Sequence, residues 1–160
     1  MTEPAWTRRP PPAVGSDADL LGRWELATLS ELTRHRVDLA AALHDGARPA
    51  DADEGAVEGL LLIFEELVSN ALRHGRAPVC AEVTAFARFW LLDVSDAAVN
   101  RQPAPAVGRD PAHGGLGLHL VARLCGAYGW TVAENRKHVW ARIDHTSPEA
   151  PAPVPRAQHG

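Results

Sequence analysis

A helical repeat of apolar residues between residues 53 and 74 is the clearest pattern in the chain. Within this range apolar side chains recur at spacings of three and four residues, which places them on one face of an α-helix. Gly75 follows, and glycine is the residue that most often ends a helix. We therefore predict a long amphipathic helix from about Asp53 to His74, with this apolar face: Val57, Leu60, Leu61, Phe64, Leu67, Val68 and Ala71.

Other patterns predict shorter elements on both sides of this helix. Ser30 has the position of an N-cap for a helix that runs to about His44. A further helix is expected over residues 118–126. Strands are expected at residues 20–29, 79–86, 89–96, 130–134 and 138–143, with a hairpin turn at residues 135–137 between the last two.

The order of these elements predicts the fold class. Neighbouring strands joined by short turns form antiparallel pairs, and the amphipathic helices need one face of the sheet to cover their apolar sides. We predict an α+β fold, a two-layer sandwich with a mixed, mostly antiparallel sheet and the helices on one face. The polar segment at residues 97–113 is long for a compact domain and is typical of a lid.

Proline placement predicts the domain boundaries. Four of the 13 prolines lie in residues 1–12 and four in residues 148–155. Proline-rich ends of this kind are typical of flexible, extended segments. We expect tails at residues 1–19 and 146–160 around one domain at residues 20–145, with Trp6 in the first tail.

Composition excludes several functional classes. The formal net charge of −4 argues against a nucleic-acid-binding surface. The longest apolar run, residues 60–64, is far shorter than the ~20 residues of a membrane span. Cys80 and Cys125 are far apart and suggest reduced thiols rather than a disulfide framework. We therefore expect a cytoplasmic protein that binds neither nucleic acid nor membrane.

A polar stripe interrupts the long predicted helix. Glu66, Asn70 and His74 are four residues apart and share one face. The carbonyl oxygen of Asn70 suits magnesium, and Glu66 is placed to act as a general base. Arg73 and His74 are candidates for phosphate contacts. The stripe is also compatible with a merely solvated face, and Glu65 competes for the role of Glu66.

Two further features point to a nucleotide. Residues 113–118 place three glycines before a predicted helix, where free backbone N–H groups suit phosphate. The segment fits neither a Walker loop nor a dinucleotide-binding fingerprint. Asp96 ends a predicted strand, where its carboxylate is suited to accept a hydrogen bond from an adenine amino group. Glycine before a helix and aspartate after a strand are each also common in ordinary turns.

Taken in order, these segments resemble the GHKL (Bergerat-fold) ATPases. Residues 66–75, ELVSNALRHG, resemble the N box of that family, and Asp96 resembles the aspartate of its G1 box. The resemblance covers residues 25–143. It implies ATP and Mg²⁺ as ligands, with Glu66 as the catalytic base, Asn70 as the metal ligand and Asp96 at adenine. The segment that resembles the G2 box, GxGL, implies phosphate binding by Gly115, Leu116, Gly117 and Leu118.

Within the GHKL ATPases, the short lid and the closing segment GWTVAENRKHVWARI are most similar to anti-sigma-factor serine kinases. This resemblance implies a regulator that binds a sigma factor or an anti-sigma-factor antagonist and phosphorylates a serine of the antagonist. A homodimer is a further implication of the family alone.

One departure from the family pattern supports an alternative function. Ala98 stands where the G1 box, usually DxGxG, has a glycine. A β-carbon at that position crowds the purine or excludes a positive φ. The alternative is a non-catalytic, anti-sigma-like binding module for which nucleotide is only a structural or regulatory ligand.

Overall fold

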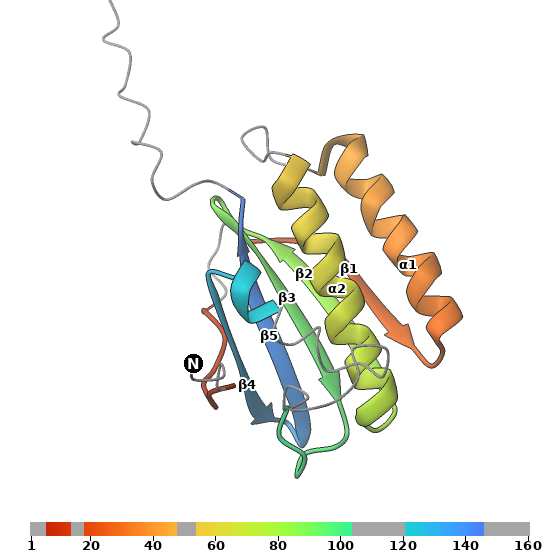
Figure 1. Cartoon of the computed structure of the whole chain (residues 1–160), viewed down its shortest axis with the longest axis vertical. Coiled ribbons are helices and arrows are strands. Elements are labelled where there is room, and N and C mark those ends of the chain that lie inside the picture. Colours follow the sequence, from red (N-terminus) through yellow and green to blue (C-terminus); the bar gives the residue numbers. More distant parts are fainter. Residues whose placement is uncertain (1–5, 14–17, 48–53, 104–120, 146–160) are drawn as a thin grey trace, which may run out of the picture.

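The computed structural model of the chain describes residues 6–13, 18–47, 54–103 and 121–145. These residues form a five-stranded sheet with two long helices, α1 and α2, on one face (Figure 1). The predicted two-layer α+β fold is therefore confirmed. The elements are β1 (Asp19–Leu26), α1 (Leu29–Ala42), the π-helical turn η1 (Leu43–Ala47), α2 (Glu54–His74), β2 (Val79–Ala85), β3 (Phe89–Asp96), β4 (Ala127–Ala133) and β5 (Arg136–Asp144).

The sheet has the strand order β1-β2-β3-β5-β4, and every pair of neighbouring strands is antiparallel. Because side chains alternate between the two faces of a strand, every second residue points toward the helices. On β3 these are Trp90, Leu92 and Val94, and on β5 they are Val139, Ala141 and Ile143, all of which lie in the core. Asp96 and Lys137 have the same phase, so they extend this face at one end of the sheet.

The start of α1 differs from the sequence prediction. Thr28, not Ser30, is the N-cap, and its hydroxyl oxygen accepts a hydrogen bond from the backbone N–H of Glu31 at 3.2 Å. The Glu31 carboxylate in turn accepts a hydrogen bond from the Thr28 hydroxyl at 3.2 Å. A Thr-x-x-Glu pattern satisfies the free end of a helix better than Ser30 could, since Ser30 has no acidic residue three positions later.

The hairpin between β4 and β5 also differs from the prediction. Its turn residues are Glu134 and Asn135, which both have positive φ (52° and 61°). Two consecutive positive φ values are typical of the type I′ turn that joins tightly paired strands. The turn therefore lies earlier than the predicted residues 135–137, and Lys137 is a strand residue that faces the helices.

Residues 6–9 lie against the edge strand β4. The backbone N–H of Arg9 donates to the carbonyl oxygen of Trp130 at 2.8 Å, and the N–H of Trp130 donates to that of Thr7 at 3.2 Å. The Trp6 side chain is 3% exposed and packs against Tyr128, with ring centroids 4.7 Å apart. The expectation that Trp6 belongs to a flexible tail is therefore wrong, because its indole is part of the core.

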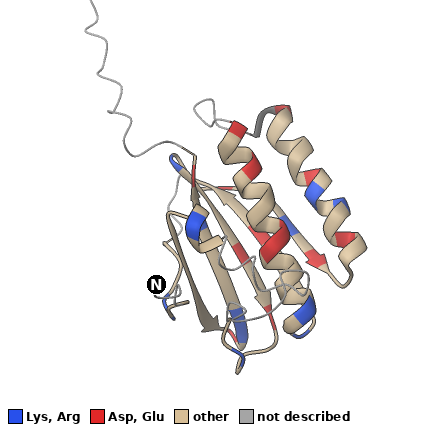
Figure 2. Cartoon of the chain, viewed as in Figure 1, with Lys and Arg blue, Asp and Glu red and all other residues tan. Residues whose placement is uncertain are grey.

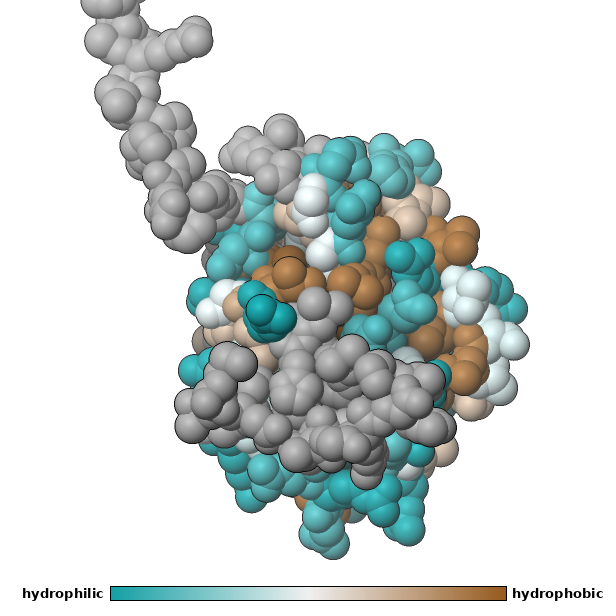
Figure 3. All heavy atoms as spheres, viewed as in Figure 1, coloured by the Kyte–Doolittle hydropathy of each residue, from teal (hydrophilic) through white to brown (hydrophobic). Residues whose placement is uncertain are grey.

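The surface of the helix side carries apolar side chains in several places (Figure 3). The large exposed apolar residues of the described part are Leu20, Leu29, Val37 and Leu124. No helix among the described residues is long and apolar enough to cross a membrane.

Candidate nucleotide site

Helix α2 carries the predicted polar stripe along the edge of its buried face. Glu66, Asn70 and His74 are each partly buried, whereas Arg73 is exposed. Residues on either side of the stripe, including Leu67, Val68 and Ala71, pack into the core. The stripe is therefore not a fully solvated helix face.

The structure separates the two neighbouring glutamates of the stripe. The Glu65 side chain is half exposed and forms an ion pair with Arg36 of α1 at 3.3 Å. Burial raises the pKa of Glu66, and the negative charge of Glu65 raises it further, while Arg73 opposes the shift. A carboxylate with a raised pKa is a better proton acceptor near neutral pH, and the general-base role of Glu66 stays a prediction.

Asp96, the last residue of β3, lies at the C-terminal end of α2. The residue is 1% exposed. Its Oδ1 accepts hydrogen bonds from the backbone N–H groups of Ala98 at 2.7 Å and Arg76 at 3.4 Å. The structure thus joins the predicted N-box helix to the predicted adenine-binding aspartate through the segment that directly follows α2.

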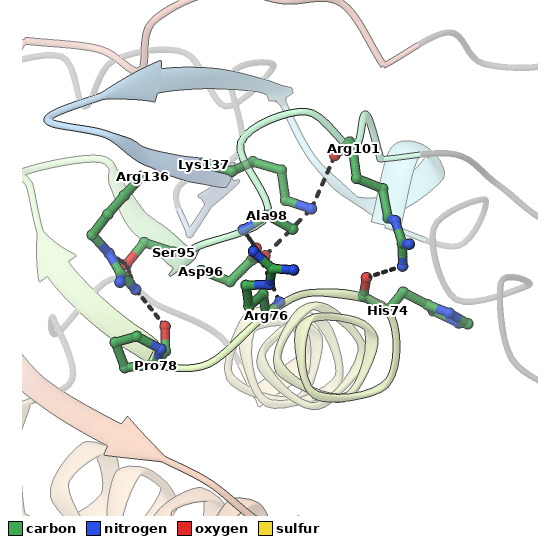
Figure 4. A network of polar contacts seen from close by, with 9 residues as sticks. All are labelled: His74, Arg76, Pro78, Ser95, Asp96, Ala98, Arg101, Arg136 and Lys137. Carbon is green, nitrogen blue, oxygen red and sulfur yellow. Dashed lines mark hydrogen bonds and ion pairs between the residues drawn. The ribbon is translucent and has the colours of Figure 1, made fainter.

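Lys137 faces Asp96 from the neighbouring strand β5, where the two residues are register partners (Figure 4). The Lys137 Nζ lies 3.3 Å from Asp96 Oδ2 and donates to the carbonyl oxygen of Arg101 at 3.0 Å. Their side chains are 6% and 1% exposed, so this ion pair is buried. A buried carboxylate beside a buried ammonium keeps its charge compensated.

The sequence prediction missed Lys137 because it placed this residue in the hairpin turn. The sequence signal that could have placed Lys137 correctly is the alternation of residues between the two faces of β5. Lys137 is two residues before Val139 and therefore has the same phase as the core residues of β5. A lysine at such a position is unusual, because lysine is rarely buried without a partner.

The structure removes one objection to the segment that resembles the G1 box, namely that Ala98 stands where the backbone needs a positive φ. Among the described residues, the non-glycine residues with positive φ are Glu134 and Asn135, and Ala98 is not one of them. Alanine therefore fits the backbone conformation after β3 without strain. The N–H of Ala98 also makes the shortest hydrogen bond to Asp96.

Several Lys and Arg positions lie at the end of the molecule where α2 ends and β5 begins (Figure 2). Among them, Arg101 is exposed, and its Nη1 donates to the carbonyl oxygen of His74 at 2.7 Å. This bond connects the segment after β3 to the last turn of α2. Positive charge at this end suits an anionic ligand such as a nucleoside triphosphate.

Several sequence predictions lie outside the described residues. These are Gly115, Leu116, Gly117 and Leu118 of the glycine-rich segment, and residues 104–113 of the expected lid. Of the helix predicted over residues 118–126, residues 121–124 are described and helical. The phosphate-binding roles of the glycine-rich segment stay predictions.

Residues 27–143 match the family of histidine kinase-like ATPase domains. A search of the curated proteins found no match. The family match covers both the α2 stripe and the Asp96 site, as well as most of the chain, and supports an ATP-binding domain of the GHKL type. The chain therefore belongs to the histidine kinase-like ATPase domain family.

Proposed function

We propose that this protein is a regulator that binds Mg-ATP between α2 and the end of β3 and transfers the γ-phosphate to a serine of a partner protein. One observation carries this proposal. Glu66, with its raised pKa, lies one helical turn before Asn70 on the helix whose end meets Asp96. The proposed general base and metal ligand therefore belong to one helix, and the proposed adenine-binding carboxylate belongs to the strand beside it.

In this proposal Asp96 recognises adenine. Two backbone N–H groups and Lys137 hold its carboxylate, so its orientation is fixed before a ligand arrives. A fixed acceptor binds an amino group without first losing side-chain freedom. The Asp96 carboxylate would accept a hydrogen bond from the 6-amino group of adenine.

Asn70 is the proposed magnesium ligand. Magnesium takes oxygen ligands, keeps several waters and often binds through one or two protein atoms together with phosphate oxygens. No group of three or more His, Cys, Asp or Glu side chains among the described residues could hold a metal ion. A single amide oxygen beside the phosphates fits this chemistry, and the bound ion would neutralise charge on the triphosphate.

Glu66 is the proposed general base. It accepts the proton of the attacking serine hydroxyl as the serine oxygen forms a bond to the γ-phosphorus. The bond between the γ-phosphorus and the β–γ bridging oxygen breaks, and ADP leaves with that electron pair. Without an acceptor protein, a water in the same position would yield ADP and inorganic phosphate slowly.

The identity of the partner follows from resemblance to anti-sigma-factor serine kinases. We propose a sigma factor, an anti-sigma-factor antagonist or both as partners, in the cytoplasm, with the chain acting as a homodimer. We further propose that residues 20–145 form the ATP-binding domain. Residues 6–9, which pair with β4, extend this domain.

Calorimetric titration of Mg-ATP tests the binding part of the proposal. We expect the wild type to bind Mg-ATP and Asn70→Ala to bind it at least about tenfold more weakly, as expected for loss of one ligand to a charged group. Removal of magnesium should weaken the wild type and leave Asn70→Ala nearly unchanged. A wild type that binds no ATP would refute the proposal.

Release of ADP from Mg-ATP tests the catalytic part. Glu66→Gln should abolish this turnover and keep its affinity for ATP, because the amide cannot accept the proton. Glu65→Gln is the matched control, since it removes the adjacent carboxylate, which pairs with α1. If the wild type binds ATP but, like Glu66→Gln, releases no ADP, the protein is the non-catalytic binding module instead.

A further inference from the structure

The buried pair of Asp96 and Lys137 leaves a defined set of hydrogen-bonding positions. A carboxylate has about four acceptor positions. Three of those on Asp96 are taken, by the N–H groups of Ala98 and Arg76 and by the ammonium of Lys137. A lysine ammonium has three N–H donors. Two of those on Lys137 point to Asp96 and to the carbonyl oxygen of Arg101.

Among the contacts of the described residues, the pair therefore leaves one acceptor position on Asp96 and one donor on Lys137 for the proposed base. Adenine has the complementary pattern on its Watson–Crick edge, where the 6-amino group donates and the neighbouring N1 accepts. Guanine has the reverse pattern there, because O6 accepts and N1–H donates. In the same placement guanine would set O6 against a carboxylate and N1–H against an ammonium, and both contacts are repulsive.

Burial of the pair decides which ring nitrogen Lys137 reaches. The side chains of Asp96 and Lys137 are 1% and 6% exposed, so both are buried at this end of the sheet. The base carries its ribose on N9 and must keep that end toward the phosphates. N1 and the 6-amino group belong to the six-membered ring, at the far end of the purine from N9, whereas N7 belongs to the five-membered ring that carries the ribose.

From this geometry we infer that Lys137 is a second base-reading residue, which donates a hydrogen bond from Nζ to N1 of adenine while Asp96 accepts one from the 6-amino group. The inference rests on the proposed ATP site and extends it to a determinant of base selectivity. Lys137 also compensates the charge of Asp96 in the absence of a ligand.

Analogues of ATP that lack one ring nitrogen test this inference. In 1-deaza-ATP a C–H replaces N1, so the Lys137 donor loses its acceptor. We expect the wild type to bind 1-deaza-ATP about tenfold or more weakly than ATP, the loss typical of a hydrogen bond to a charged group. The wild type should bind 7-deaza-ATP nearly as well as ATP.

Variants at position 137 connect this effect to the lysine. Lys137→Met removes the donor and should bind ATP and 1-deaza-ATP with similar affinity, and it should discriminate less against GTP. Lys137→Gln keeps an N–H donor and should recover part of the difference in affinity between ATP and 1-deaza-ATP. If Lys137→Met fails to fold because Asp96 is left uncompensated, Lys137→Gln takes its place, and its loss of affinity from ATP to 1-deaza-ATP should be smaller than that of the wild type.

Three results would overturn the inference. The first is a wild type that binds ATP and 1-deaza-ATP equally. The second is a loss of affinity confined to 7-deaza-ATP. The third is tighter ATP binding by Lys137→Met, which would mean that the ammonium competes with the base for Asp96. A wild type that binds none of the nucleotides would instead refute the proposed ATP site itself.

Discussion

A β-carbon built on Gly75 would lie 2.6 Å from Oδ2 of Asp96 and 2.6 Å from the carbonyl oxygen of Ala71. The end of α2 and the end of β3 thus meet where only a glycine fits. We predict that Gly75→Ala lowers the free energy of unfolding by about 2 kcal/mol, since overpacking of a tight contact forces its neighbours to shift. It should also weaken ATP binding, because the carboxylate of Asp96 must move. Denaturant unfolding and calorimetry measure the two effects.

Gly59 provides the matched control on the same helix. Apart from its chain neighbours and the nearby backbone of α2, a β-carbon at Gly59 would meet no atom within 4 Å. Alanine is favoured over glycine inside a helix, so Gly59→Ala should raise the free energy of unfolding by about 0.5–1 kcal/mol. Its ATP affinity should equal that of the wild type. Weakened binding by both variants would show that the effect of Gly75→Ala comes from α2 as a whole rather than from Asp96.

Trp6 should contribute strongly to stability although it lies near the N-terminus of the chain. Its side chain is 3% exposed, and its carbonyl oxygen accepts a hydrogen bond from the Trp130 indole at 3.1 Å. We predict that Trp6→Ala lowers the free energy of unfolding by about 3 kcal/mol, as expected for removal of a buried indole. Thr7→Ala, which truncates an exposed neighbouring side chain, should change it by less than about 0.5 kcal/mol. Equal values for the two variants in thermal or urea unfolding would contradict the packing described for Trp6.

The elements that the sequence predicted well are those determined by local patterns. The apolar repeat of α2 and the stop at Gly75 both depend on residues within a few turns of each other. The strands β2 and β3 were also predicted to within about a residue, because apolar runs and the short connection between them are contiguous in the chain.

Trp6 and Lys137 were misplaced because their positions depend on contacts that are remote in sequence. Trp6 packs against Tyr128, more than a hundred residues later, across a backbone pairing that no local pattern indicates. Lys137 was misplaced because the type I′ turn uses Glu134, which is not among the residues most favoured for positive φ. That shift hid the ion pair with Asp96.

The pair of His138 and Asp93 predicts a dependence of stability on pH. Nδ1 of His138 lies 3.0 Å from Oδ1 of Asp93 on the sheet face opposite the helices. The hydrogen bond to Asp93 raises the pKa of His138 above its ordinary value of 6.5, although burial opposes the shift. Because the folded-state pKa is the higher one, this stabilisation is complete below the unfolded-state pKa and is lost as the pH rises through the folded-state pKa.

We therefore expect the wild type to have a higher free energy of unfolding than His138→Gln. This difference should be largest below pH 6.5 and should shrink as the pH rises above that value. Urea unfolding of both proteins at a series of pH values measures this difference. In an Asp93→Asn background the same comparison should lose most of its pH dependence. A difference that grows with pH would contradict the assigned sign.

The pH profile of ADP release should report the environment of Glu66. A general base must be deprotonated to act, so turnover should rise with pH, with a midpoint above the ordinary carboxyl pKa of 4.5. Glu65 raises the pKa of Glu66 and Arg73 lowers it. Glu65→Gln should therefore move the midpoint to lower pH and Arg73→Gln should move it to higher pH. Because the two variants remove opposite charges from one helix, shifts in the same direction, or none in either, would show that a group other than Glu66 controls the acid limb.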